Sequence, residues 1–429
     1  MRWPVAAREP MRLCSFVLLF FCLWIPSARA QEDEETDDLS ENTVTGKAPL
    51  TPAVSDPVSP TTGASDEEIR AWMNRPFAAA SYRAAEALGI EVELADAVTK
   101  VCELLYTRNY PDAKKYLDEI SQKYPTLGLG PLGHALIYQA LMFENYDYRY
   151  EKQYRQAYDS TRAQLDKGLK TDGNEALENI VLTGILGVEA IHVMRKGEFV
   201  AAVGKALEAM KALENVRKKA PTLPDLKMVD GLYMYWRSAV SLSSKAIPDF
   251  PDRRAEGIAL MQEAEKSAYY VGPASSLALA YSYIEERQLK LALDRCLLVR
   301  VKYADNVINN MTLGRIYTSM KRYDDAIRVY EEVKKDASSN QRVYYQEGLV
   351  FYYMQRYPDA LKAFQTYVGF KEVPTDARAT AWYRIGVVYS KQHKPTEAIA
   401  AHSQAVKLND HEGAKRAIAR IQAREAEKQ

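Results

Sequence analysis

Cysteine, glycine and proline are all scarce in this sequence. Its 429 residues include four cysteines, 20 glycines and 19 prolines, and no stretch shows the alternating apolar pattern of a β-strand. Two cysteines fall within the first 30 residues, which leaves Cys102 and Cys296 for the folded part of the chain. Their wide separation excludes a disulfide framework and favours two buried free thiols. The lack of helix breakers and of strand patterns predicts an all-α fold.

The signatures of common enzymes and of metal or nucleotide sites are also missing. The sequence contains no G-x-x-x-x-G-K-[ST] phosphate loop, no H-E-x-x-H and no C-x-x-C. Three of its five histidines, His393, His402 and His411, recur every nine residues, a spacing that does not bring them to one face of a helix. No residue stands out as a nucleophile. We therefore predict that the protein is not an enzyme and holds no cofactor and no metal.

A long apolar run occurs only near the N-terminus. Residues 15–26 are apolar, follow Arg2, Arg8 and Arg12, and precede the small-residue pattern Ala28-Arg29-Ala30. This arrangement is typical of a secretory signal peptide and predicts cleavage before Gln31. An uncleaved signal anchor is the alternative. We therefore predict a signal peptide over residues 1–30 and an exported protein of the periplasm or cell envelope.

Charge is balanced over the whole chain but unevenly distributed. Residues 31–65 contain eight acidic residues and one lysine among many Ser, Thr and Pro, with almost no apolar side chain to bury. Such a composition predicts a disordered acidic linker over residues 31–65. The rest of the chain is only slightly basic, which argues against nucleic acid as a partner.

The sequence is organised around residues 307–338. They contain Leu313-Gly314-x-x-Tyr317 and then Tyr323-x-x-Ala326-x-x-x-Tyr330-x-x-Val333. Two helices that cross at small residues can approach closely, while the large residues fill the space around the crossing. The pattern recurs 34 residues earlier, 34 later and 38 later again: Leu279-Ala280-x-x-Tyr283 with Ala292 and Cys296; Gly348-x-x-Phe351 with Ala360 and Phe364; and Trp382-x-x-Ile385-Gly386-x-x-Tyr389 with Ala398 and His402.

This period and pattern resemble the tetratricopeptide repeat, a helix–turn–helix unit of 34 residues. The last copy departs from the family at His402, where an aromatic residue is usual. The resemblance implies an α-solenoid of about eight hairpins forming a right-handed superhelix. We expect divergent hairpins over residues 66–272, regular repeats over 273–412, and a capping helix and tail over 413–429. The turn 108–112 matches the turn 355–359, which links the two ends of the array.

The resemblance also implies a concave groove lined by the first helix of each pair. The sequence has 29 tyrosines, and several fall on positions that face the groove in this family. Tyrosine offers rigid apolar area and a hydroxyl group, which suits peptide binding. The alternative is that these rings pack between neighbouring first helices. The predicted partner-binding residues are Tyr281, Arg315, Tyr345, Tyr352, Tyr353, Tyr383 and Lys391.

Together these features predict a non-enzymatic scaffold or adaptor that binds a protein or peptide partner in an envelope complex for assembly, secretion or transport. The family's Lys/Asn clamp for a C-terminal carboxylate is not matched, because Met311 and Arg315 stand at its positions. A different class of protein remains as the alternative, a solute- or lipid-handling component of a transport system that encloses a small ligand.

Overall fold

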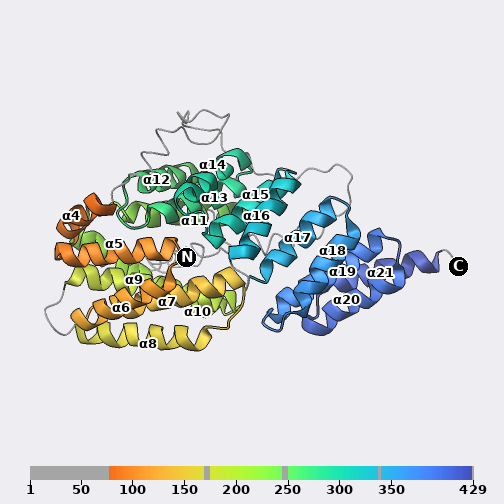
Figure 1. Cartoon of the computed structure of the whole chain (residues 1–429), viewed down its shortest axis with the longest axis horizontal. Coiled ribbons are helices and arrows are strands. Elements are labelled where there is room, and N and C mark those ends of the chain that lie inside the picture. The colour runs from red at the N-terminus through yellow and green to blue at the C-terminus, as the bar shows by residue number, and fades with distance from the viewer. Residues whose placement is uncertain (1–76, 169–173, 244–249, 337–339, 428–429) are drawn as a thin grey trace, which may run out of the picture. The chain divides into compact units, whose positions relative to one another are not determined.

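The computed structural model describes residues 77–168, 174–243, 250–336 and 340–427 (Figure 1). These residues form eighteen helices and no strand, so the predicted all-α fold is confirmed. The predicted signal peptide, the acidic linker and the first residues of the expected hairpins, 66–76, lie outside the described residues. The helices are α4 (Phe77–Leu88), α5 (Val92–Tyr106), α6 (Tyr110–Lys123), α7 (Leu129–Asn145), α8 (Glu151–Gly168), α9 (Glu175–Arg195), α10 (Phe199–Lys219), α11 (Leu226–Ser243), α12 (Arg254–Ser267), α13 (Gly272–Glu285), α14 (Leu289–Lys302), α15 (Val307–Ser319), α16 (Tyr323–Asp336), α17 (Arg342–Tyr353), α18 (Tyr357–Gly369), α19 (Thr375–Lys391), α20 (Pro395–Asn409) and α21 (Glu412–Ala426).

Helices α5 to α20 form eight successive helix–turn–helix pairs, with α4 before them and α21 after them. The chain divides into two compact units. In the described part, the first unit is residues 77–140 and 150–306, and the second is residues 141–149 and 307–427. The sequence becomes regular at residue 273, but the packing boundary follows Asn306, one hairpin later. The first hairpin with the regular repeat pattern, α13–α14, therefore belongs to the first unit, and the later ones belong to the second unit.

The turn inside most hairpins has one recurring backbone geometry. The residue two positions before the second helix has a positive φ of 58–59° in five hairpins, at Arg108, Arg287, Lys321, Gln355 and His393. The next residue then donates its backbone N–H to the first helix five residues back, as Arg356 does to the Phe351 carbonyl at 2.8 Å. This is the bond of a Schellman helix end, in which a left-handed residue lets the chain reverse. The matching turns at 108–112 and 355–359 thus share one conformation.

Helix crossings inside the hairpins follow the predicted rule of one small and one large residue. A Cβ atom added to Gly348 would lie 2.6 Å from the Phe364 ring, and one added to Gly314 would lie 2.3 Å from the Tyr330 ring. In the last hairpin the same place over Gly386 is taken by His402, whose ring would lie 2.5 Å from an added Cβ atom. The histidine that departs from the sequence pattern therefore occupies the position of the aromatic residue.

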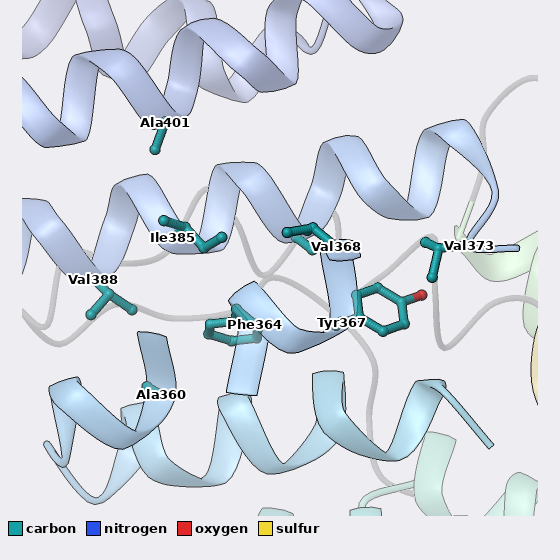
Figure 2. Packing of buried hydrophobic residues seen from close by; sticks show 9 residues of the cluster. Ala360, Phe364, Tyr367, Val368, Val373, Ile385, Val388 and Ala401 are labelled. Atoms are coloured by element: carbon teal, nitrogen blue, oxygen red, sulfur yellow. The ribbon is translucent and has the colours of Figure 1, made fainter. Parts of the chain in front are cut away.

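The core of the second unit lies between α18, α19 and α20. Figure 2 shows Phe364 and Tyr367 of α18 directed toward the space beside α19, where Ile385 and Val388 project. The buried α18 residues Ala360, Phe364, Tyr367 and Val368 recur at helical spacing and form one apolar stripe. Each hairpin thus covers the apolar face of the next, and at the end α21 packs on α20.

Helix α9 is the apolar centre of the first unit. It packs against α8 and α10, and its buried residues lie on nearly every side of the helix. By length and composition it is the one described helix that could cross a membrane, yet 72% of its apolar window is buried within the protein. A largely apolar helix that is buried over most of its length is a core helix.

The first unit does not follow the expectation that each repeat touches only its neighbours. The Tyr303 hydroxyl at the end of α14 donates to Glu103 of α5 at 2.9 Å, and the rings of Tyr106 and Tyr303 lie 5.4 Å apart. The first hairpin therefore contacts the fifth. Cys102 on α5 and Cys296 on α14 nevertheless form no disulfide, and burial raises the pKa of the Cys102 thiol to about 12.

Candidate partner-binding surface

The seven residues predicted to bind a partner lie on four first helices. Tyr281 is on α13 in the first unit, and the other six are in the second unit: Arg315 on α15, Tyr345, Tyr352 and Tyr353 on α17, and Tyr383 and Lys391 on α19. The seven side chains differ in how much of their surface is exposed to solvent. Tyr353 and Lys391 are exposed, Arg315, Tyr345 and Tyr352 are half-buried, and Tyr281 and Tyr383 are buried.

Helix α17 presents the tyrosines that remain accessible. Tyr353 is 49% exposed, and its ring lies 5.6 Å from that of Tyr352 in an edge-on contact. Tyr352 in turn lies 6.2 Å from Tyr357 at the start of α18. Tyr345, two turns earlier, packs on Phe364 and Tyr367 at 5.5 and 5.4 Å. Tyr352 and Tyr353 thus form a surface pair supported from behind, whereas Tyr345 is partly a packing residue.

Tyr383 is only 3% exposed because two histidines cover its ring. His411, before α21, stacks on it at 4.9 Å with planes 12° apart, and His402 of α20 lies 5.3 Å away. Tyr281 on α13 is 7% exposed. These two rings expose little surface to a partner. For them, burial favours the alternative that the tyrosines are packing residues. The binding role of the seven residues as a set stays a prediction.

Burial leaves the two histidines beside Tyr383 uncharged. It lowers the pKa of His402 to about 4, and the neighbouring His411 and Arg420 act in the same direction. Burial also lowers the pKa of His411. Both imidazoles are therefore neutral at neutral pH. The side chains that pack against Tyr383 at the end of the second unit thus carry no charge.

The first helices of the two units carry opposite charge. In the second unit α15, α17, α19 and the terminal α21 contain nine basic and four acidic residues. In the first unit α5, α9, α11 and α13 contain four basic and eight acidic residues. The basic residues of these four helices of the second unit are Arg315, Arg342, Arg378, Arg384, Lys391, Lys415, Arg416, Arg420 and Arg424. An anionic partner would therefore favour the second unit.

Several charged groups instead join one hairpin to the next. Arg254 at the start of α12 is 4% exposed and donates to Glu286, after α13, at 2.8 and 2.9 Å. Lys334 of α16 lies 2.7 Å from the buried Glu347 of α17. Burial raises the pKa of Glu347, and Lys334 opposes that change. These pairs fix the packing between hairpins and are not available to a partner.

One buried polar cluster in the first unit has the residue types of a catalytic site. His192 of α9 lies 2.6 Å from Glu151 and 3.2 Å from Gln139, and its ring is 4.5 Å from that of Tyr154. The histidine is fully buried, and burial lowers its pKa to about 4. These contacts join α9 to Gln139 of α7 and to Glu151 and Tyr154 of α8. Across the described residues, no group of three His, Cys, Asp or Glu side chains is placed to hold a metal ion.

The family model of the tetratricopeptide repeat matches two parts of the second unit. One match covers residues 379–412, which include most of α19, all of α20 and the first residue of α21. The other covers residues 309–335, in the α15–α16 hairpin. The second unit thus contains tetratricopeptide repeats. The matched segments include Arg315, Tyr383 and Lys391 of the predicted surface, and α17 lies between them.

Two solved structures are similar to this chain. The crystal structure of the APC/C hetero-tetramer Cut9-Hcn1 is 12% identical, with 85% of this chain and 91% of that chain covered and a TM-score of 0.39. The crystal structure of the P58(IPK) TPR domain is 13% identical, with 79% and 99% covered and a TM-score of 0.26. Both TM-scores are low, so neither likeness bears on function. No match is found among curated protein sequences.

Proposed function

We propose that this protein is a non-enzymatic scaffold or adaptor that binds a protein or peptide partner on the first-helix face of its second unit. Tetratricopeptide repeats serve as protein-interaction scaffolds, and the second unit contains the repeats that match the family. The observation that carries the proposal is the pair Tyr352 and Tyr353 on α17. Tyr353 is a large, half-exposed aromatic side chain beside a second one, and such side chains dominate binding energy at protein interfaces.

Charge on the neighbouring helices supports the same face. Arg315 of α15 and Lys391 of α19 lie on the helices on either side of α17 in the sequence, and Lys391 is exposed. A partner segment with carboxylates beside an apolar residue would satisfy both kinds of contact. Tyr281 and Tyr383 are not part of this proposed contact area, because they are buried.

The test is partner capture by the full chain with Tyr352→Ala and Tyr353→Ala. The matched control is Tyr82→Ala, which removes a 71% exposed tyrosine from α4 in the first unit. Partners captured from the native source are quantified by mass spectrometry, and circular dichroism checks the fold. We expect the double variant to lose at least about tenfold in capture, since two hot-spot rings contribute more than 1.4 kcal/mol together. Full capture by a folded double variant would refute the proposal.

We place the scaffold in the cell envelope, in the periplasm, within a complex for assembly, secretion or transport. The support is the pattern of residues 1–30, with basic residues, an apolar run and Ala28-Arg29-Ala30. Mass determination of the protein from its native source tests this location. An N-terminus at Gln31 and recovery from the envelope fraction are expected. An intact N-terminus in a cytosolic fraction would contradict it.

The alternative function, a solute- or lipid-handling component, is favoured by one observation. The first unit closes on itself, because α5 contacts the end of α14 through Glu103, Tyr106 and Tyr303. A closed array of repeats suits the enclosure of a small ligand better than an open one. Native mass spectrometry of the purified chain separates the two functions, since a carrier should retain a small molecule and a scaffold should not.

A further inference from the structure

Helix α21 closes the end of the second unit, and two histidines lie where it packs. It packs on α20, and its buried residues Ala414 and Ala417 share one apolar cluster with Tyr383 of α19. The Tyr383 ring contacts His402 of α20 on one side and His411, the residue before α21, on the other. We propose that proton uptake by these two imidazoles at acidic pH releases α21 from the second unit, while the helices before it remain folded.

The His402 ring cannot accommodate a proton while α21 is docked. It is 1% exposed and packs over Gly386, and neither ring nitrogen has a hydrogen-bond partner among the described residues. A charged imidazole needs acceptors or water at both nitrogens, so a charge at this place costs free energy. Burial lowers the pKa of His402 to about 4. The ring therefore takes up a proton at mildly acidic pH only when water reaches it.

Undocking of α21 is the movement that brings water to His402. Ala405, one turn further along α20, packs in the same cluster as Ala414 and Ala417. Arg420, three residues beyond Ala417, is close enough to lower the pKa of His402 further. The two helices therefore lie side by side, with the Arg420 turn of α21 near His402. Release of α21 removes this cover and the nearby arginine together.

His411 provides a second acid-sensitive contact, at the start of α21. Its Nδ1 atom accepts the backbone N–H of Ala414 at 3.3 Å, so the neutral ring caps the helix. A protonated Nδ1 carries a hydrogen and can no longer accept this bond. Burial lowers the pKa of His411 as well. Protonation therefore removes the side-chain cap that stabilises the first turn of α21.

Most charged groups around the two imidazoles oppose proton uptake in the docked state. Besides burial, the side chains that act on them are three arginines and one carboxylate: Arg384 of α19, and Arg416, Arg420 and Glu412 of α21. The arginines lower the pKa of the imidazoles, whereas Glu412 and the backbone of His411 raise the pKa of His411. Asp410 and Lys415, on either side of His411, pair with each other at 2.7 Å. A proton bound here thus destabilises docking.

The direction of the pH effect follows from the lowered pKa of His402. Above about pH 6.5 the ring is neutral whether α21 is docked or released, so its titration favours neither state. Between about pH 6.5 and 4 the released state binds the proton first, so docking weakens as the pH falls. With a pKa of about 4 when docked and about 6.5 when released, the opening equilibrium rises about twentyfold from pH 7 to pH 5.

Hydrogen exchange of the full chain, followed by mass spectrometry at pH 7 and pH 5, tests this release. Protection factors correct for the pH dependence of the intrinsic exchange rate. In peptides from α21 they should fall at least about twentyfold between the two pH values, and in α16 to α18 by less than about threefold. An equal fall throughout the second unit, or an unchanged α21, would overturn the inference.

Two conservative variants separate the histidines from other effects of acid. His402→Phe keeps a ring over Gly386, and His411→Asn keeps a side chain that caps a helix. Circular dichroism at pH 7 checks the fold. The double variant should retain the protection of α21 at pH 5, and each single variant should lose less protection than the wild type. The matched control is His393→Asn, which changes an exposed histidine in the turn before α20. Equal losses in the control and in all three variants would contradict the inference.

Release of α21 also bears on the partner-binding face, and this consequence rests on the proposed function. Tyr352 of α17 packs against the same apolar cluster as Ala414 and Ala417, so undocking removes support from the tyrosine pair. Partner capture should weaken from pH 7 to pH 5 more in the wild type than in the double histidine variant, and equal weakening would refute this consequence. Hydrogen exchange needs no partner, so the release of α21 and the scaffold function can fail independently.

Discussion

His402 shows how a polar ring replaces an aromatic one at a helix crossing. It packs over Gly386 as Phe364 packs over Gly348, and it is 1% exposed. A phenyl ring and an imidazole both fill this space, but only the imidazole can take up a proton. Because burial lowers the pKa of His402 to about 4, the folded state disfavours that proton. The substitution adds a pH dependence that the neighbouring hairpins do not have at this position.

This pH dependence is the first prediction. Above pH ~6.5 the His402 ring is neutral in both the folded and the unfolded state, so its titration does not affect stability. As the pH falls from about 6.5 toward 4, the unfolded state binds the proton first, and the free energy of unfolding falls by up to roughly 3 kcal/mol. His402→Phe should remove this loss, as measured by thermal unfolding between pH 7 and 4. The control is His393→Asn, which changes an exposed histidine in the turn before α20. A wild-type profile in the Phe variant would contradict the assignment.

Glycine at the crossing is the second residue-scale prediction. An added Cβ atom at Gly348 would meet Phe364 at 2.6 Å, so either the ring or the helix must move. Gly348→Ala should lower the free energy of unfolding by about 1 to 3 kcal/mol, the usual cost of overpacking a core. Gly369→Ala is the control, because nothing lies within 4 Å of a Cβ atom added there. Urea denaturation compares the two. A neutral Gly348→Ala would show that the helices can separate at little cost.

At the scale of elements, the turns inside the hairpins store backbone strain. Gln355 has a φ of 58° between α17 and α18, in the left-handed region that residues with a Cβ atom disfavour. In the first unit Gly197, with a φ of 81°, holds the matching place between α9 and α10. Five hairpins therefore have a residue with a Cβ atom at a position whose conformation favours glycine.

Relief of that strain is the third prediction. Gln355→Gly should raise the free energy of unfolding by up to about 1 kcal/mol, because glycine adopts a positive φ without steric cost. The matched control is Gln365→Gly, the same substitution at an exposed position inside α18, which should lower it by about 1 kcal/mol. Opposite signs for the two variants are expected in urea denaturation. A loss of stability in both would mean that the Gln355 side chain outweighs the strain.

The hairpins show what sequence reasoning could predict and what it could not. The pairs of small and large residues, such as Gly314 with Tyr330, are local in sequence and recur, so the crossing geometry was predictable. Whether a groove tyrosine is exposed could not be predicted. The ring of Tyr383, for example, is covered by His411, which belongs to the segment before the next helix. The repeat pattern predicts which way a residue faces within its own hairpin. It does not predict whether a side chain from another helix covers that residue.

At the scale of the whole molecule, the contact between α5 and α14 was the least predictable feature. The two helices lie about two hundred residues apart in sequence, as the bond from Tyr303 to Glu103 shows. Asn306 adds a bond to the Tyr106 carbonyl at 3.2 Å, and Tyr106 donates to the Tyr270 carbonyl at 3.1 Å. A repeat array is expected to gain stability only from adjacent units. Here the first hairpin and the fifth also stabilise each other.

This closure gives the fourth prediction. Tyr106→Ala removes the partly buried ring that packs with Leu298, Val299 and Tyr303, and it should cost roughly 2 to 4 kcal/mol, somewhat less than the loss of a fully buried aromatic ring. Hydrogen exchange should rise in α5 and also at the end of α14, because each helix loses its cover. Tyr116→Ala on α6 is the control, since that side chain is 37% exposed and lies outside the contact. If Tyr106→Ala raises exchange only in α5 and its neighbours α4 and α6, the first unit behaves as an open array. Joint loosening of α5 and α14 would instead show that closure is part of its folding unit.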